Sequence, residues 1–277
     1  MTRTPLVPLE LLLKITAHLP YESIAELSSI REIQRLLKSD HFWRDRILKI
    51  STRSQLLCIL RDPYSRHAKR LDLCGADLDD TDLMFIANHF QTIHHINLSQ
   101  VSDLTDLGLA SLLKLHGKHL QSLKLHKLFR LTNVTMENIS TLCGPSLHCL
   151  DLHSTMISST GLRELTEGGL MIKELILERC HILDPSCLPV LGEGLPTLRK
   201  ISVAHIDAVH PYQLQALLQA CPKLKTLDVS GCAEVTLKTI KQLQGTNHRL
   251  HIKHDAKLED HSIDGVRRFL LGLVSVQ

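Results

Sequence analysis

Hydrophobic residues recur in a fixed short pattern from about residue 68 toward the C-terminus. Seven segments follow the pattern x-x-x-L-x-L with aliphatic residues at the two marked positions: AKRLDL (68–73), IHHINL (93–98), LQSLKL (120–125), LHCLDL (147–152), IKELIL (172–177), LRKISV (198–203) and LKTLDV (224–229). Apolar and polar residues alternate in each segment, which is typical of a strand with one buried face. The pattern therefore predicts seven short strands.

These segments are evenly spaced along the chain. Their first marked residues are Leu71, Ile96, Leu123, Leu150, Leu175, Ile201 and Leu227, and successive members lie 25 to 27 residues apart. An eighth, truncated copy, HRLHIKH (248–254), follows and is expected to begin a C-terminal cap. A constant period of this length indicates an array of structural repeats.

Between the predicted strands, aliphatic residues recur at helical spacing behind a Ser, Thr, Asp or Pro. Examples are TDLGLASLLKL (105–115), SSTGLRELTEG (158–168), HPYQLQALLQA (210–220) and VTLKTIKQLQG (235–245). Strands joined by such helices must be parallel, with right-handed crossovers. The predicted fold class is therefore α/β: a right-handed leucine-rich-repeat solenoid, or horseshoe, with the strands inside and the helices outside.

The first part of the chain does not repeat. Residues 7–50 show helical spacing and no L-x-L strand, and three short helices fit them, with Pro8 in the first turn of one helix and Pro20 at its end. A further helix is expected within 51–67, ended by Asp62 and Pro63. We therefore predict a helical domain at 1–50, a linking helix at 51–67, and a solenoid of about seven repeats with a cap at 68–277.

Composition agrees with a thin, layered core. The 277 residues include 55 leucines but only nine Phe, Trp and Tyr, and repeated layers of similar volume can be filled by leucine alone. The formal charge is +3, with 43% hydrophobic and 22% charged residues, as in ordinary globular proteins. No apolar run is long enough for a membrane span, and the start of the chain does not resemble a signal peptide. The eight cysteines form no C-x-x-C pair, so we expect free thiols in a reducing compartment.

Two units carry L-x-x-C after the strand, within 176–191 and 221–243. These units resemble the cysteine-containing subtype of leucine-rich repeats, which has a period of about 26 residues, as here. Cys180 and Cys232 lie where the chain leaves the strand, and a small thiol packs well between layers. We therefore expect both to be structural rather than redox-active or metal-binding.

The first 50 residues resemble an F-box. The likeness consists of a Pro-x-Glu start, then Leu-Leu-x-Ile, then His-Leu-Pro before a Ser-Ile-x-x-Leu helix, and a Phe-Trp ending at residues 42–43. An F-box followed by cysteine-type repeats is the order found in F-box/leucine-rich-repeat proteins. An alternative interpretation is that residues 7–60 only form the helical cap that shields the first repeat of any solenoid.

The resemblance implies a function without catalysis by the chain itself. It would be the substrate-recognition subunit of an SCF-type cullin-RING ubiquitin ligase, with the F-box docking a Skp-type adaptor and the repeats binding a protein substrate. The apolar residues exceed what three short helices can bury, so some should meet another surface. The expected adaptor-binding residues are Pro8, Leu9, Glu10, Leu12, Leu13, Ile24, Leu27, Phe42 and Trp43.

Two other classes of function stay open. One is a protein-binding scaffold or assembly factor without a ubiquitin link, which includes a bacterial effector that mimics a host F-box protein. The other is an enzyme, either a GTPase activator with an arginine supplied from a loop or a ligase with its own cysteine domain. We disfavour the ligase because too little chain follows the last repeat strand for a catalytic domain. The expected location is the cytoplasm, with the nucleus, or the host cytosol for an effector, as alternatives.

Polar residues flank the buried positions of the strands and should line the concave face. The substrate-binding candidates are His95, Asn97, Lys124, His126, Asp151, His153, Glu174, Glu178, Lys200 and Asp228. Their mixed signs favour a protein partner over nucleic acid, which would require a basic stripe with stacking aromatics. His95, His126, Asp151 and His153 could converge on neighbouring strands, but no metal-binding or catalytic motif supports such chemistry. We expect no metal and no cofactor.

Overall fold

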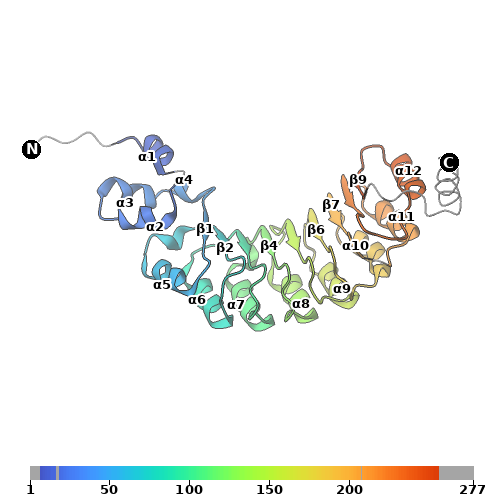
Figure 1. The fold of residues 1–277 in the computed structure, drawn as a ribbon, viewed down its shortest axis with the longest axis horizontal. Helices are drawn as coiled ribbons and strands as arrows, with labels where there is room; N and C mark the ends of the chain where they lie inside the picture. Colours follow the sequence, from blue (N-terminus) through green and yellow to red (C-terminus); the bar gives the residue numbers. More distant parts are fainter. Residues whose placement is uncertain (1–6, 17–18, 207, 256–277) are drawn as a thin grey trace, which may run out of the picture.

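The computed structural model describes residues 7–16, 19–206 and 208–255, in which nine strands form one open parallel sheet. The sheet lines the inside of an arc, and helices cover its outside (Figure 1). The predicted horseshoe is thus confirmed. The strands follow sequence order: β1 (Ile47–Lys49), β2 (Arg70–Asp72), β3 (His95–Asn97), β4 (Ser122–Lys124), β5 (Cys149–Asp151), β6 (Glu174–Ile176), β7 (Lys200–Ser202), β8 (Thr226–Asp228) and β9 (His251–Lys253).

The central residue of each strand points into the core and pairs in register with the central residues of its neighbours. Leu123, for example, is the partner of Ile96 on one side and of Leu150 on the other. The seven aliphatic residues at the first marked position of the x-x-x-L-x-L pattern all occupy this central position, and each is at most 3% exposed. The predicted strand register is therefore confirmed, because burial of one face fixes it.

The sheet begins one strand earlier than the sequence analysis expects. β1 pairs with β2, and Leu48 is the partner of Leu71. The expectation that no strand occurs within 7–50 is therefore wrong. Ile47, which flanks the buried Leu48, is apolar although it is exposed. The sequence of this strand therefore does not alternate between apolar and polar residues, and the pattern does not identify it.

Within the described residues, one α-helix follows each strand from β1 to β8, and four more helices form the N-terminal end. The helix α5 (Arg53–Arg61) lies within the span expected for a linking helix. The others in the repeats are α6 (Asp80–His89), α7 (Asp106–His116), α8 (Asn133–Leu142), α9 (Ser159–Glu167), α10 (Leu188–Gly194), α11 (Pro211–Ala220) and α12 (Leu237–Thr246). Short 3-10 turns are η1 (Ser65–His67), η2 (Gly117–His119) and η3 (Pro185–Cys187).

The N-terminal helical unit, residues 7–46 as far as they are described, contains α1 (Leu9–Thr16), α2 (Tyr21–Glu26), α3 (Arg31–Leu37) and α4 (Asp40–Trp43). It lies at one end of the arc (Figure 1). The sequence analysis expects three helices here, and the fourth is the short turn that carries Phe42 and Trp43. Part of the expected C-terminal cap, residues 256–277, lies outside the described residues.

A turn of constant shape follows each strand from β2 to β8. Four residues after the central strand residue, the backbone is left-handed, with φ between 53° and 71°, at Gly75, Gln100, Lys127, Ser154, Arg179, His205 and Gly231. Only two of these are glycine, so five residues adopt a conformation that L-residues rarely take. The backbone N–H of each of the first six donates to a carbonyl of the next repeat, for example Lys127 to His153 at 2.9 Å. This ladder offsets the local strain.

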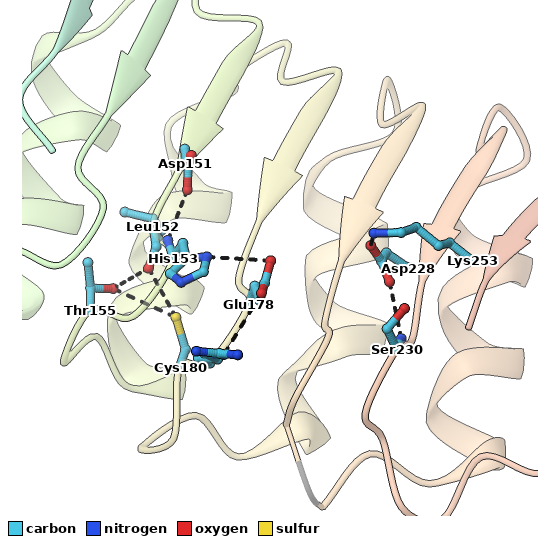
Figure 2. A network of polar contacts seen from close by, with 10 residues as sticks. Asp151, Leu152, His153, Thr155, Glu178, Cys180, Asp228, Ser230 and Lys253 are labelled. Carbon is cyan, nitrogen blue, oxygen red and sulfur yellow. Dashed lines mark hydrogen bonds and ion pairs between the residues drawn. The ribbon is translucent and has the colours of Figure 1, made fainter. Parts of the chain in front are cut away.

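Side chains also link successive repeats. The thiol of Cys180 donates to the Leu152 carbonyl at 3.1 Å, and that of Cys232 donates to the Val203 carbonyl at 3.2 Å. Figure 2 shows Cys180 between Leu152 and Thr155. Burial raises the pKa of the Cys180 thiol, with hydrogen bonds involving Thr155 and Ser154 acting in the opposite direction, so the protonated form is favoured. The predicted structural role of these two cysteines is confirmed.

Near the helix starts, carboxylates join one repeat to the next. Asp106 in the first turn of α7 accepts hydrogen bonds from the backbone N–H of Thr132 at 3.0 Å and from its hydroxyl at 2.8 Å. The same carboxylate accepts a bond of 2.5 Å from the buried hydroxyl of Thr135. Asp80 binds Thr105 in the same two ways one repeat earlier. These contacts fix the stacking of adjacent helices.

Candidate functional site

The concave face is the first candidate site, because the polar residues that flank the central strand residues lie there. The structure places nine of the ten substrate-binding candidates at this surface with partial or full exposure. Asp228 is the exception, since it is only 9% exposed. One of its oxygens accepts from the backbone N–H of Ser230 at 3.1 Å and the other accepts from Lys253 at 2.9 Å (Figure 2). Its role is therefore mainly to hold the turn after β8.

Two histidines and a glutamate meet in the middle of this face. The rings of His126 and His153 have centroids 4.1 Å apart, and His153 Nδ1 lies 3.4 Å from Glu178 Oε2 (Figure 2). The pKa of His126 is lowered, first by burial and then by the neighbouring His153. A neutral His126 can therefore face His153 without charge repulsion.

The other two members of the expected convergence have different surroundings. Asp151 Oδ1 accepts the backbone N–H of His153 at 3.0 Å and so caps the turn after β5. His95 lies in β3 beside Arg70 of β2. Among the residues that the structure describes, no three His, Cys, Asp or Glu side chains come together in a way that could hold a metal ion.

Several charges on the C-terminal half of the face are paired between neighbouring strands. Lys200 of β7 contacts Glu174 of β6, and Lys253 of β9 contacts Asp228 of β8. Because hydrogen bonds from Lys253 and Ser230 outweigh the effect of burial, the pKa of Asp228 is lowered. The carboxylate of Glu178 has Arg179 Nε at 3.9 Å as well as His153.

A pocket of about 220 Å³ opens on the N-terminal part of the face. It is lined mainly by residues of β2, β3 and β4, including the expected residues His95, Asn97 and Lys124. Asn97 Nδ2 donates to Asp72 Oδ1 at 2.9 Å, and Asn97 Oδ1 accepts the backbone N–H of Ser99. Arg70 also lines this pocket and was not among the expected binding residues.

The N-terminal helical unit is the second candidate site, and its core is aromatic. Trp43 has no exposed surface, its ring lies 4.8 Å from that of Phe42 and 5.3 Å from that of Tyr21, and its indole N–H donates to the Leu37 carbonyl at 2.8 Å. Ile24, Leu12 and Phe42 are buried as well. The structure therefore corrects the expectation that these four residues, Trp43 above all, present themselves to a partner.

The remaining expected adaptor residues are accessible. Pro8, Glu10 and Leu27 are exposed, whereas Leu9 and Leu13 are half-buried against the core. The structure adds large apolar side chains that the sequence analysis does not select. They are Leu11, 49% exposed, and Ile15, 58% exposed, both in α1, and Ile30, 45% exposed, before α3. The spacing of Leu11 and Ile15 places them on one face of the helix, which is the signal that could have identified them.

A cleft of about 780 Å³ separates this unit from the start of the sheet. Its lining includes Leu13, Leu19 and Ile47 together with Arg46, whose guanidinium donates to the Leu19 carbonyl at 2.9 Å. The Arg46 guanidinium also lies over the Phe42 ring, 4.4 Å from its centroid. A further bond of 2.6 Å from this guanidinium to the Thr16 carbonyl ties the segment before β1 to the end of α1.

Within the described residues, no helix combines the length and apolar character that a membrane crossing requires. No family model matches the chain. The solved structures to which the chain is similar include three examples. In the TLR13–ssRNA13 complex, the match has a TM-score of 0.48 and 17% identity and covers 78% of this chain and 30% of that chain. For the leucine-rich repeat-containing protein LegL7 from Legionella pneumophila, the TM-score is 0.48 and the identity 12%, with 78% of each chain covered. For the Rad7–Elc1 complex in yeast, the TM-score is 0.33 and the identity 17%, with 88% of this chain and 90% of that chain covered.

Among curated proteins, the chain is similar to F-box/LRR-repeat protein 4 of Bos taurus, with 28% identity over 187 residues. The match covers 66% of this chain but 30% of the relative. The resemblance drawn from the sequence is thus supported by a relative of that name as well as by the parallel sheet and its register. The chain therefore has the leucine-rich-repeat fold and is similar to an F-box/LRR-repeat protein.

Proposed function

We propose that the chain is a non-catalytic substrate-recognition subunit of an SCF-type cullin-RING ubiquitin ligase. In this role the N-terminal helical unit docks a Skp-type adaptor, and the concave face of the repeats holds the protein to be modified. The chain would then act in the cytoplasm or the nucleus, where such ligases work.

The exposed apolar side chains of the N-terminal helical unit carry the proposal. The interior of the unit is already filled by Trp43, Phe42 and Ile24, yet Leu11, Ile15, Leu27 and Ile30 remain about half exposed. A concentration of large apolar side chains at a surface is typical of a protein-binding site. A cap that served only to shield the first repeat would need its apolar side chains on the inside.

The arrangement of the two candidate sites also supports the proposal. The N-terminal helical unit lies at the end of the arc, whereas the strands line the inner curve (Figure 1). An adaptor bound to α1 would therefore leave the middle of the concave face accessible to a second protein. The similarity to an F-box/LRR-repeat protein agrees with this division of roles.

Capture of a Skp-type adaptor by the co-expressed full chain tests the proposal. We expect the double variant Leu11→Asp/Ile15→Asp to lose the adaptor, because two carboxylates on the docking face cannot be buried without a large cost. The matched control is Leu107→Asp/Phe129→Asp, which changes side chains that are 77% and 63% exposed in the repeats. This control should retain the adaptor.

Two results would contradict the proposal. The first is failure of the unmodified chain to capture any Skp-type adaptor, and the second is equal capture by the two double variants. As a control, the unmodified chain and both double variants should have the same melting temperature. We expect this because all four substituted side chains are exposed.

A further inference from the structure

The cations of the concave face differ in how they are compensated. Toward the C-terminus, Lys200 and Lys253 each contact a carboxylate of the preceding strand. Toward the N-terminus, Lys49 of β1, Arg70 of β2 and Lys124 of β4 have no carboxylate within ion-pair distance among the described residues. The positive charge of this end of the face is therefore available to a ligand.

The pocket between β2 and β4 lies within this positive region. Its charged lining consists of Arg70 and Lys124 against one carboxylate, Asp72, and neutral donors are supplied by Asn97 and Ser122. Arg70 Nε is buried and has no hydrogen-bond acceptor in the described structure. No acceptor within the described protein therefore fixes Arg70 Nε, and the other N–H groups of this guanidinium are the donors that an incoming anionic oxygen would contact.

His95 contributes to the same pocket as a neutral group. Its pKa is lowered, first by burial and then by the positive charges of Arg70 and His94. At neutral pH it can therefore donate or accept a hydrogen bond without adding charge. Counting Lys49, Arg70 and Lys124 against Asp72 leaves a net charge of +2 on this part of the face.

We propose that the concave face over β1 to β4 binds an acidic segment of the partner protein, with at least two carboxylates that contact Arg70 and Lys124. The inference rests on the proposed function, because it assumes that the concave face holds a partner. It adds the chemical class of the bound segment and the end of the solenoid at which it binds.

The separation of the cations favours several carboxylates over one compact anion. Arg70 is level with Ser122 in the sheet, so Lys124 lies two strands across and two residues further along, with a backbone separation of roughly 12 Å. Two carboxylates on one bound segment can each contact one of these cations, without both side chains having to converge on a single anion. In an extended peptide, side chains on the same side recur every ~7 Å, so alternate acidic residues can reach both cations.

Fluorescence anisotropy with a fluorescein-labelled peptide of alternating Glu and Ser tests the inference on the full chain. We expect saturable binding, weakened about tenfold or more by Arg70→Gln/Lys124→Gln, since two charge-assisted hydrogen bonds are lost. The matched control is Lys200→Gln/Lys253→Gln, which removes the same formal charge from the same face. It should change the affinity by less than about twofold, because at physiological salt the electrostatic effect of these two lysines is largely screened beyond about 8 Å.

The other outcomes are equally informative. Equal weakening by both double variants would overturn the inference, because binding would then depend on net charge alone. A labelled Gly-Ser peptide with a single phosphoserine is the comparison ligand. If it binds and the Glu-Ser peptide does not, the partner is a phosphorylated segment and not an acidic one. Absence of saturable binding of both peptides would reject the site.

These failures are distinguishable from failure of the proposed function. Adaptor capture depends on the N-terminal helical unit, so retained capture with no peptide binding rejects only the acidic-segment inference. If Arg70→Gln/Lys124→Gln lowers the melting temperature, the single variant Lys124→Gln decides, since this lysine is exposed. It should still weaken peptide binding by about threefold or more.

Discussion

The repeats and the N-terminal helical unit bury their apolar side chains by different means. In the repeats, each central strand residue such as Leu150 is covered by the same residues of the units before and after it. In the N-terminal helical unit, Tyr21, Phe42 and Trp43 pack around one another without repetition. On one side of this unit, Leu11 and Ile15 are not fully covered by any other part of the described chain. The end of a solenoid is thus the place where surface is left for a partner.

The largest effect should come from Trp43→Ala. Loss of a fully buried Trp costs about 3–5 kcal/mol of unfolding free energy, and here the Leu37 carbonyl also loses its donor. Chemical denaturation followed by circular dichroism would measure the loss. Leu11→Ala in the same unit should cost about 0.5 kcal/mol or less, because its side chain is half exposed. Similar losses for the two variants would mean that the aromatic core is not as tightly packed as described.

In the repeats, Leu150→Ala should cost roughly 2–5 kcal/mol, because it opens a cavity at the centre of the array. Lys124→Ala on the neighbouring strand should change the stability by about 0.5 kcal/mol or less, since its side chain is exposed. Denaturant midpoints for the two variants decide the matter. Equal shifts would contradict the register in which Leu150 pairs with Leu123.

Asp106→Ala tests the polar links between helices and should have an intermediate effect. The hydroxyl of Thr135 is fully buried and would lose its carboxylate acceptor, a cost of about 1–3 kcal/mol. Asp103→Ala is the matched control, because Asp103 forms an exposed ion pair with Arg130, worth about 1 kcal/mol or less. If the control proves as destabilising as Asp106→Ala, the links do not hold the helices as proposed.

A smaller effect should appear as a function of pH. The pKa of the buried His116 is lowered by burial, while its Nε2 lies 2.8 Å from the Ala87 carbonyl. A lowered pKa in the folded state means that the unfolded state binds the proton more readily. Stability should therefore be complete above the ordinary histidine pKa of 6.5 and fall as the pH drops below it.

His89, His94, His95 and His126 also have lowered pKa values, chiefly through burial, so they act in the same direction. All five histidines lie in the repeats. Thermal unfolding at a series of pH values would measure their sum, and His116→Gln should reduce the slope. A stability that rises as the pH falls from 6.5 would contradict the lowered values.

The sequence predicts the repeats well because their signal is redundant. A central leucine that recurs every 25 to 27 residues fixes strand, period and register together. Thr155, at the position that Cys180 occupies one repeat later, donates its hydroxyl to the Leu152 carbonyl at 2.7 Å, so the turn is retained without a cysteine. The left-handed residues Lys127 and Arg179 could not have been predicted, because nothing in their side chains distinguishes them from residues in ordinary turns.

The N-terminal helical unit shows where such prediction fails. Its helices have four to eight residues, too few for periodicity to show which side faces inward. Trp43 and Phe42 were therefore expected at an interface, although they form the core. On the concave face, His126 and His153 were expected on neighbouring strands, and their rings are in contact. The pocket beside Arg70 could not be predicted in the same way, because three strands, β2, β3 and β4, form it together.

The central claim is that the N-terminal helical unit and the concave face bind different partners. Titration calorimetry with a purified Skp-type adaptor tests it most directly, using the unmodified chain, Leu11→Asp/Ile15→Asp and Arg70→Gln/Lys124→Gln. We predict equal adaptor affinities for the unmodified chain and the concave-face variant, and a loss of more than about tenfold for the α1 variant at an unchanged melting temperature. An α1 variant that binds the adaptor as tightly as the unmodified chain would contradict the claim.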